Sequence, residues 1–279
     1  THGVLWQQPL SGKASKLDLG EVETGGNVSV ARTGALAFIG GTASHPGELY
    51  VMNSVSARPR RLTNLNAFVD GLALGRTESI DWQGPDCFHE DGVLTYPVGY
   101  QKGRQYPLVL VIHGGPEASS TVQFSPLPQL LAAAGFVVCR PNYRGSTSYG
   151  RAFMRILDEE GHPSREHEDI LSGVRAVEAL GGIDAARLYI LGTSAGGTLT
   201  AWTIGHSERF RAAVVLHPII TYTSLALTWD LASLYSRSWL PRTPWEDPAA
   251  AWAHSPLSRV GHVRTRTLVV VGDHDQRTP

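Results

Sequence analysis

The chain has 279 residues, of which 42% are hydrophobic and 18% charged, a length and composition that suit one large domain with a smaller neighbour. Its formal net charge of −1 lacks the basic excess that nucleic acid or an anionic membrane would attract. No stretch approaches the ~18 consecutive apolar residues of a membrane span. We therefore expect neither a nucleic acid nor a membrane as a partner.

The two cysteines, Cys87 and Cys139, are too few for a disulfide framework and do not stand at a metal-ligand spacing. Two ordinary thiols fit a reducing compartment, and we expect a cytoplasmic protein. The chain begins at Thr1 rather than at Met, so the missing signal pattern at the N-terminus carries little weight. The sequence does not determine the oligomeric state, and a homo-oligomer is possible.

Residues 1–75 contain short apolar segments separated by turn residues such as Gly40-Gly41 and Pro46-Gly47. Strands are expected at residues 28–30, 35–39, 48–51 and 60–63. Four closely spaced strands predict an antiparallel meander, the unit of a β-propeller blade, although a sandwich fragment would look similar. Because a propeller closes with ~4–8 blades, this region is expected to be about one blade and a part, from the C-terminal part of a propeller domain.

Residues 76–279 alternate continuous apolar runs with helical stretches. The runs, which suit strands buried on both faces, cover residues 108–112, 136–139, 188–191, 212–216 and 268–271. In the helical stretch 168–180, Ile170, Val174 and Val177 fall on one face. The pattern predicts an α/β domain with a mainly parallel sheet, whose ligands bind beyond the carboxyl ends of the strands.

The strand at 188–191 runs directly into Gly192-Thr193-Ser194-Ala195-Gly196, and a helical pattern follows. This strand, turn and helix arrangement is typical of the nucleophile elbow of an α/β-hydrolase, in which a strained turn exposes the serine hydroxyl. A chance Gly-x-Ser-x-Gly is an alternative in a chain with 30 glycines. The strand-to-helix setting favours Ser194 as a catalytic nucleophile.

Acyl transfer also needs hydrogen-bond donors for the negative oxygen of its tetrahedral intermediate. In this fold one donor is the amide after the nucleophile, here Ala195, and another comes from a loop after an upstream strand. We assign the second donor to the amide of Gly115, in the run His113-Gly114-Gly115-Pro116. The alternative is a tight glycine turn with a packed His113.

A carboxylate at the end of a later strand can orient and stabilise an imidazolium. Gly272-Asp273-His274-Asp275 follows the run at 268–271 and offers two acids. Its spacing from Gly272 favours Asp275, with Asp273 as a turn residue. Either acid could instead be a solvated loop residue.

These motifs together resemble the prolyl oligopeptidase family of serine peptidases, and most closely its acylaminoacyl-peptidase branch. The resemblance rests on His113-Gly-Gly-Pro116, Pro141-Asn-Tyr-Arg-Gly-Ser-Thr-Ser-Tyr-Gly-Arg151, Gly192-Thr-Ser-Ala-Gly-Gly197 and Gly272-Asp-His-Asp-Gln-Arg-Thr-Pro279. Residues 46–50 and 62–66 are similar to the end of the propeller that precedes the hydrolase domain in that family.

The resemblance implies an α/β-hydrolase fold preceded by a partial β-propeller, with the boundary between residues 75 and 76. It implies a peptidase acting on short peptides, N-acylated ones among them, with Ser194 as nucleophile, Asp275 as acid and Gly115 and Ala195 as oxyanion donors. It also implies that Arg277 clamps a substrate carbonyl; an ordinary surface arginine is the alternative. Many relatives have an aromatic residue after the serine, where this chain has Ala195, which puts a particular relative's specificity in doubt.

In this fold the triad runs serine, acid, histidine along the chain. None of the 11 histidines follows Asp275, so we expect the catalytic domain to be truncated before its base and these residues alone to be inactive. His113 and His217 are the substitutes within the chain. A carboxylesterase with the same triad, or a non-catalytic interaction module, are the competing functions. The mechanism calls for no cofactor and no metal.

Overall fold

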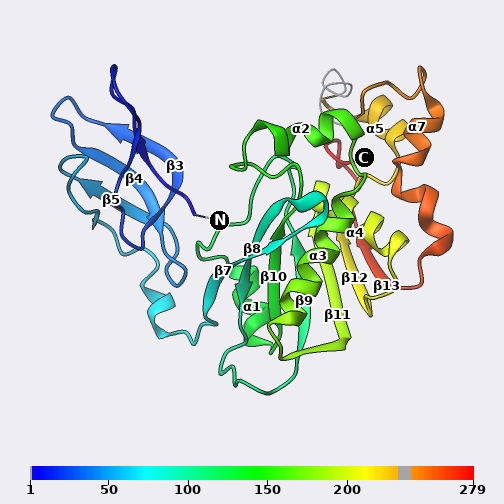
Figure 1. Ribbon diagram of the computed structural model, residues 1–279, viewed down its shortest axis with the longest axis horizontal. Coiled ribbons are helices and arrows are strands. Elements are labelled where there is room, and N and C mark those ends of the chain that lie inside the picture. Colours follow the sequence, from blue (N-terminus) through cyan, green and yellow to red (C-terminus); the bar gives the residue numbers. More distant parts are fainter. Residues whose placement is uncertain (1, 232–239) are drawn as a thin grey trace.

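The computed structural model describes residues 2–231 and 240–279. It has two parts, a small antiparallel sheet near the N-terminus and a larger domain of helices around a twisted sheet (Figure 1). The blue and pale blue strands of the first part stand to one side of the larger domain, and a connection through the short helix η1 (Ala67–Gly71) joins the two.

The N-terminal part contains the predicted meander. Its four-stranded sheet has the order β3-β4-β5-β6, with every neighbouring pair antiparallel. The strands are β3 (Glu23–Val30), β4 (Leu36–Gly41), β5 (Glu48–Met52) and β6 (Arg60–Arg61), beside a ribbon of β1 (Trp6–Gln7) and β2 (Ser15–Lys16). Phe38, Tyr50 and Met52 form its core, with the two rings stacked at 6.0 Å between centroids. The sequence prediction of these strands is confirmed, and β3 begins earlier than predicted.

The larger domain is built on a seven-stranded sheet of order β13-β12-β11-β9-β10-β8-β7. Its parallel strands are β9 (Tyr106–Ile112), β10 (Val137–Asn142), β11 (Ile183–Thr193), β12 (Ala212–Leu216) and β13 (Arg266–Val270). Antiparallel β8 (His89–Thr95) and β7 (Thr77–Gln83) complete one edge. The sheet is therefore mainly parallel, as predicted, and its two antiparallel strands were not predicted.

Helices fill the connections between the strands. They are α1 (Pro126–Ala133), α2 (Arg151–Glu160), α3 (Glu166–Ala179), α4 (Ala195–His206), α5 (Tyr222–Thr228) and α7 (Pro248–Ala253), with 3-10 helices η2 (Pro85–Cys87) and η4 (Pro256–His262). Helix α3 matches the predicted amphipathic stretch, because Ile170, Val174 and Val177 are buried in the main core. That core lies around the central strands, where Leu108 and Leu110 of β9 are fully buried. Because the central strands are anchored in this core, the loops that follow their carboxyl ends start from fixed positions.

One prediction about burial is wrong. The apolar run at 268–271 was expected to be buried on both faces, yet Leu268, Val269 and Val271 are 58%, 52% and 60% exposed. Strand β13 stands at the end of the sheet order beside β12, and side-chain exposure depends on what packs on the two faces of the strand. Within the described ranges, β12 is the element with extensive contacts to β13, and no helix packs closely on its faces.

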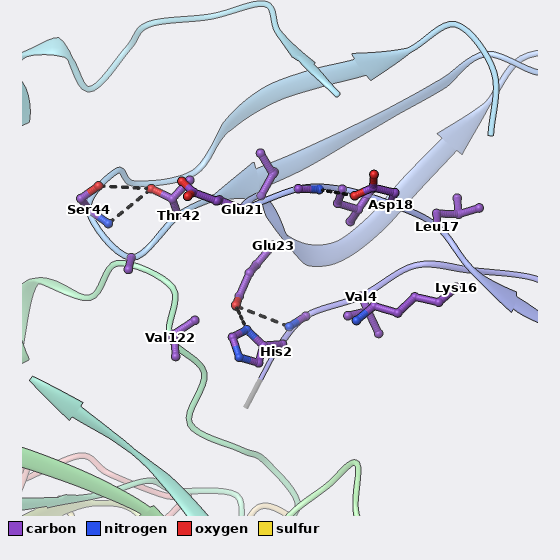
Figure 2. A pocket seen from close by; sticks show the side chains of 15 residues that line it. His2, Val4, Lys16, Leu17, Asp18, Glu21, Glu23, Thr42, Ser44 and Val122 are labelled. Atoms are coloured by element: carbon purple, nitrogen blue, oxygen red, sulfur yellow. Dashed lines mark hydrogen bonds and ion pairs between the residues drawn. The ribbon is translucent and has the colours of Figure 1, made fainter. Parts of the chain in front are cut away.

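The two parts of the chain meet at a backbone hydrogen bond from Phe124 to the carbonyl of Thr42, 2.8 Å long. A cavity of about 750 Å³ lies beside this junction. Figure 2 shows Val122 of the larger domain at one side and Glu23 bonded to His2 at the other. The Nδ1 to Oε1 distance of that pair is 2.5 Å. Ser194 does not line this cavity, which is therefore separate from the predicted site.

Candidate active site

Ser194 occupies the sharp turn between strand β11 and helix α4. Its backbone φ of 60° and ψ of −127° place a non-glycine residue in a region that L-amino acids rarely adopt. The turn is held from both sides, because the Ser194 amide donates to Leu216 O at 2.9 Å and its carbonyl accepts from the Thr198 amide at 2.9 Å. The strained serine predicted from the sequence is therefore present.

The glycines around Ser194 are required by close backbone contacts. A Cβ atom on Gly192 would lie 2.2 Å from the carbonyl oxygen of Gly196, and one on Gly196 would lie 2.2 Å from the carbonyl oxygen of Ile112. Neither contact can be relieved by rotating a side chain, since the opposing atoms are backbone. These two positions let α4 start directly against β9 and β11.

Replacing Gly192 by alanine should therefore lower stability sharply. We expect Gly192→Ala to reduce the free energy of unfolding by about 3 kcal/mol, the upper range for overpacking. Gly261→Ala is the matched control, because a Cβ there meets nothing within 4 Å, and its effect should stay within about 0.5 kcal/mol. Urea unfolding of both variants checks this, and equal midpoints would contradict the close-contact argument.

The loop after β9 carries the predicted oxyanion donor. Gly115 has a φ of 128°, a conformation suited to glycine, and precedes Pro116 through a cis peptide bond. His113 anchors the start of this loop: its Nε2 lies 3.0 Å from Ser146 Oγ, and its ring stacks on Tyr143 at 4.3 Å between centroids. Burial lowers the pKa of His113 to about 4, so its ring is neutral at physiological pH. His113 is therefore a packed side chain, as the alternative interpretation of this run in the sequence proposed.

Asp275 lies in the turn after β13 and accepts three hydrogen bonds. Its Oδ1 accepts from the amides of Arg277 at 2.9 Å and Thr278 at 3.0 Å, and its Oδ2 accepts from the Thr278 hydroxyl at 2.9 Å. These bonds, with the Thr278 amide the largest contributor, lower the pKa of Asp275 and keep it ionised. Asp273, the competing acid, has a 93% exposed side chain.

His217 is the histidine that approaches the acid. Its Nδ1 lies 3.4 Å from Asp275 Oδ2, and its backbone has a φ of 47° just beyond β12. Neither His217 nor His113 forms a hydrogen bond with Ser194 in the described part of the chain. The structure thus brings His217 beside Asp275 without joining it to the serine.

Arg277 is paired with a residue that sequence reasoning missed. Its Nε and Nη2 donate to the two carboxylate oxygens of Asp230, each at 2.8 Å. The Asp230 amide also donates to the carbonyl of Gln276 at 3.0 Å. This bidentate pair raises the pKa of Arg277 and lowers that of Asp230. It leaves Nη1 of Arg277 with donors for a further acceptor.

Asp230→Asn should weaken the bidentate pair that holds the Arg277 guanidinium in place. If Arg277 binds a substrate carbonyl, we expect KM for a peptide substrate to rise about tenfold with a smaller change in kcat, because a positioned charged donor loses its partner. Asp184→Asn is the control, since Asp184 also pairs with an arginine, accepting from Arg187 Nε at 2.7 Å, but at the start of β11. Steady-state kinetics of the full-length protein test the difference; an unchanged KM in Asp230→Asn would refute the positioning role.

A cavity of about 360 Å³ joins these elements at the carboxyl edge of the sheet. Ser194, Gly115 and Arg277 all line it, so the structure brings these predicted site residues together. Ala195 is buried at the first position of α4, directly after the serine. Asp275 does not line the cavity itself but is hydrogen-bonded to Arg277 and Thr278, which do. The remaining walls come from Pro116, Glu117, Leu157, Ile219, Trp229, Leu231 and Thr278. Among the described residues, no three His, Cys, Asp or Glu side chains lie close enough together to hold a metal ion.

The serine lies on a strained turn between a parallel strand and a helix, with a glycine loop after the adjacent strand β9 and an acid after β13 at the same edge of the sheet. This arrangement defines an α/β-hydrolase domain with a serine site. The model of the prolyl oligopeptidase family matches residues 122–279. The chain belongs to the prolyl oligopeptidase family.

Relatives agree with this assignment. The chain is similar to the uncharacterized peptidase YuxL of Bacillus subtilis (strain 168), with 31% identity over 84% of this chain and 36% of that protein. It is 30% identical to the acylamino-acid-releasing enzyme of Sus scrofa, over 72% of this chain and 28% of that protein. A solved acylaminoacyl peptidase in complex with Z-Gly-Gly-Phe-chloromethyl ketone superposes with a TM-score of 0.85 and 25% identity, over 96% of this chain and 42% of that one.

The chain spans about a third of the length of the curated relatives that it matches. Two of these similar proteins belong to the acylaminoacyl-peptidase branch, which the sequence motifs also indicated.

Among the helices of residues 2–231 and 240–279, none combines the length and apolar character needed to cross a membrane.

Proposed function

We propose that this chain supplies the nucleophile, the oxyanion donors and the orienting acid of a serine peptidase that hydrolyses short peptides. The observation that carries the proposal is the cavity at the carboxyl edge of the sheet, which joins Ser194 on its strained turn to Gly115 and Arg277. Family membership and the likeness to acylaminoacyl peptidases support the reaction type.

The proposed reaction has two acyl transfers. Ser194 Oγ attacks the substrate carbonyl carbon as its proton passes to a base, and the carbonyl oxygen becomes an oxyanion. The amides of Ala195 and Gly115 donate to that oxyanion, and the Ala195 amide adds the positive end of the α4 dipole. Collapse breaks the C–N bond, the protonated base gives its proton to the leaving amine, and water then hydrolyses the acyl-enzyme.

The base needs an orienting carboxylate, which is the proposed role of Asp275. Its two oxygens keep a negative charge fixed by Thr278 and by the Arg277 amide. The expectation of a catalytic histidine after Asp275 stays a prediction. His217 remains the histidine beside Asp275 in the described structure.

A short peptide is the proposed substrate, with N-acylated peptides included. The Sus scrofa relative is named for releasing acylamino acids, and the solved relative carries a peptidyl chloromethyl ketone. Arg277 supports amide substrates, because its free Nη1 donors suit a neutral peptide carbonyl. Free thiols at Cys87 and Cys139 agree with a cytoplasmic location, and a homo-oligomer stays a prediction.

Comparing two substrates in the full-length protein tests the proposal. A peptidase should hydrolyse an acyl-amino-acid anilide with a kcat/KM near or above that for a simple nitrophenyl ester of the same acyl group. Hydrolysis of the ester alone would instead make the protein a carboxylesterase. Failure to turn over either substrate, together with no fluorophosphonate labelling, would make it a non-catalytic module.

A further inference from the structure

The described lining of the cavity at Ser194 combines apolar walls with the carboxylate of Glu117. The apolar part of the wall comes from Leu157, Ile219, Trp229 and Leu231. Among the described residues that line it, Glu117 and Arg277 carry a formal charge. A substrate group that enters this cavity therefore meets a hydrophobic surface and the electric field of these two residues.

Arg277 does not balance the charge of Glu117. Both carboxylate oxygens of Asp230 accept from the Arg277 guanidinium at 2.8 Å, so this pair is close to neutral as a unit. Among the described side chains that line the cavity, Glu117 is therefore the one whose charge is not paired.

Glu117 is exposed, and its carboxylate forms no hydrogen bond or ion pair with any of the side chains that the structure describes. Its backbone is nevertheless fixed: the Ala118 amide donates to Pro116 O at 2.7 Å, and the Thr147 amide donates to Ala118 O at 2.9 Å. This bracing fixes the Glu117 backbone next to Gly115, the proposed oxyanion donor, and from there Glu117 lines the same cavity.

We propose that Glu117 binds a cationic group of the substrate, so that the site prefers peptides with a positive charge close to the scissile bond. An ammonium or guanidinium group meets an unpaired acceptor here, and a charge-assisted hydrogen bond forms. An aliphatic stem that ends in such a cation also fits the apolar wall of Leu157 and Ile219. The cation can be a free α-ammonium group or the side chain of a lysine or arginine.

This inference rests on the proposed peptidase function, and matched substrate pairs test it in the full-length protein. The first pair is Gly-Phe-anilide against its N-acetylated form, which removes the α-ammonium. The second pair is acetyl-lysine anilide against acetyl-norleucine anilide, which removes the side-chain cation and keeps the stem. We expect kcat/KM to favour the cationic member of at least one pair about tenfold.

Glu117→Gln should abolish that ratio, and Glu117→Lys should invert it. Glu208→Gln is the control, because it makes the same change of charge on an exposed residue beyond the far end of α4 from Ser194. In that variant the ratio should match the wild-type one. A preference in the first pair alone identifies the α-ammonium, and one in the second alone identifies the side chain.

Two results would overturn the inference: equal kcat/KM within both pairs, or a cationic preference that survives in Glu117→Gln. Fluorophosphonate labelling is measured in parallel on the same samples. A labelled protein that hydrolyses neutral anilides without charge preference refutes the role of Glu117 alone. A protein that hydrolyses no anilide at all refutes the proposed peptidase function instead.

Discussion

Ser194→Ala should remove almost all hydrolytic activity of the full-length protein while leaving its fold intact. The change deletes the Oγ that forms the acyl-enzyme, and the loss of a serine nucleophile costs on the order of 10⁶ in kcat. Alanine has no larger side chain than serine, and the Ser194 backbone is held by Leu216 and Thr198. Steady-state kinetics with the anilide substrate measure the effect.

Ser79→Ala is the matched control for this change. Ser79 is exposed on β7, at the opposite edge of the sheet order from β13, and it should retain wild-type turnover. Urea unfolding should give similar midpoints for both variants. If Ser194→Ala keeps more than about a hundredth of the wild-type kcat, Ser194 is not the nucleophile.

Asp275→Asn should produce the second largest loss, a drop in kcat of about 10⁴. The amide keeps the shape of the side chain and removes the negative charge that orients and stabilises an imidazolium. KM should change little, because Asp275 lies behind the cavity wall formed by Arg277 and Thr278.

The neighbouring acid supplies a stringent control. Asp273 is two residues away in the same turn and was the competing acid in the sequence, but its side chain is 93% exposed. Asp273→Asn should therefore leave kcat unchanged within about twofold. Equal losses in Asp273→Asn and Asp275→Asn would show a general electrostatic effect of the loop instead of a specific acid.

Most of the sheet could be predicted because its strands differ from their surroundings. The continuous apolar runs that became β9, β11 and β12 identify strands buried among helices. Strands β7 and β8 carry mixed polar sequences, such as His89-Glu90-Asp91 at the start of β8, and do not have this signature. Burial was less predictable than strand formation, because the exposure of Leu268 depends on which elements pack on the faces of β13.

The site residues were predictable where a local motif carries the chemistry. The elbow glycines stand two residues to either side of Ser194, and the strain follows from that local geometry. Asp230 was missed because it pairs with Arg277 across 47 residues, with no local pattern to signal it. Glu117 was missed because its significance depends on the cavity and on the neutralisation of Arg277, which only a folded structure reveals.

The most direct test of the nucleophile is covalent labelling of the full-length protein with a fluorophosphonate, followed by peptide mapping. We predict one adduct, on the serine of Gly192-Thr193-Ser194-Ala195-Gly196, and loss of anilide hydrolysis in proportion to labelling. An adduct on a different serine, or undiminished hydrolysis by protein that is fully labelled at Ser194, would contradict it.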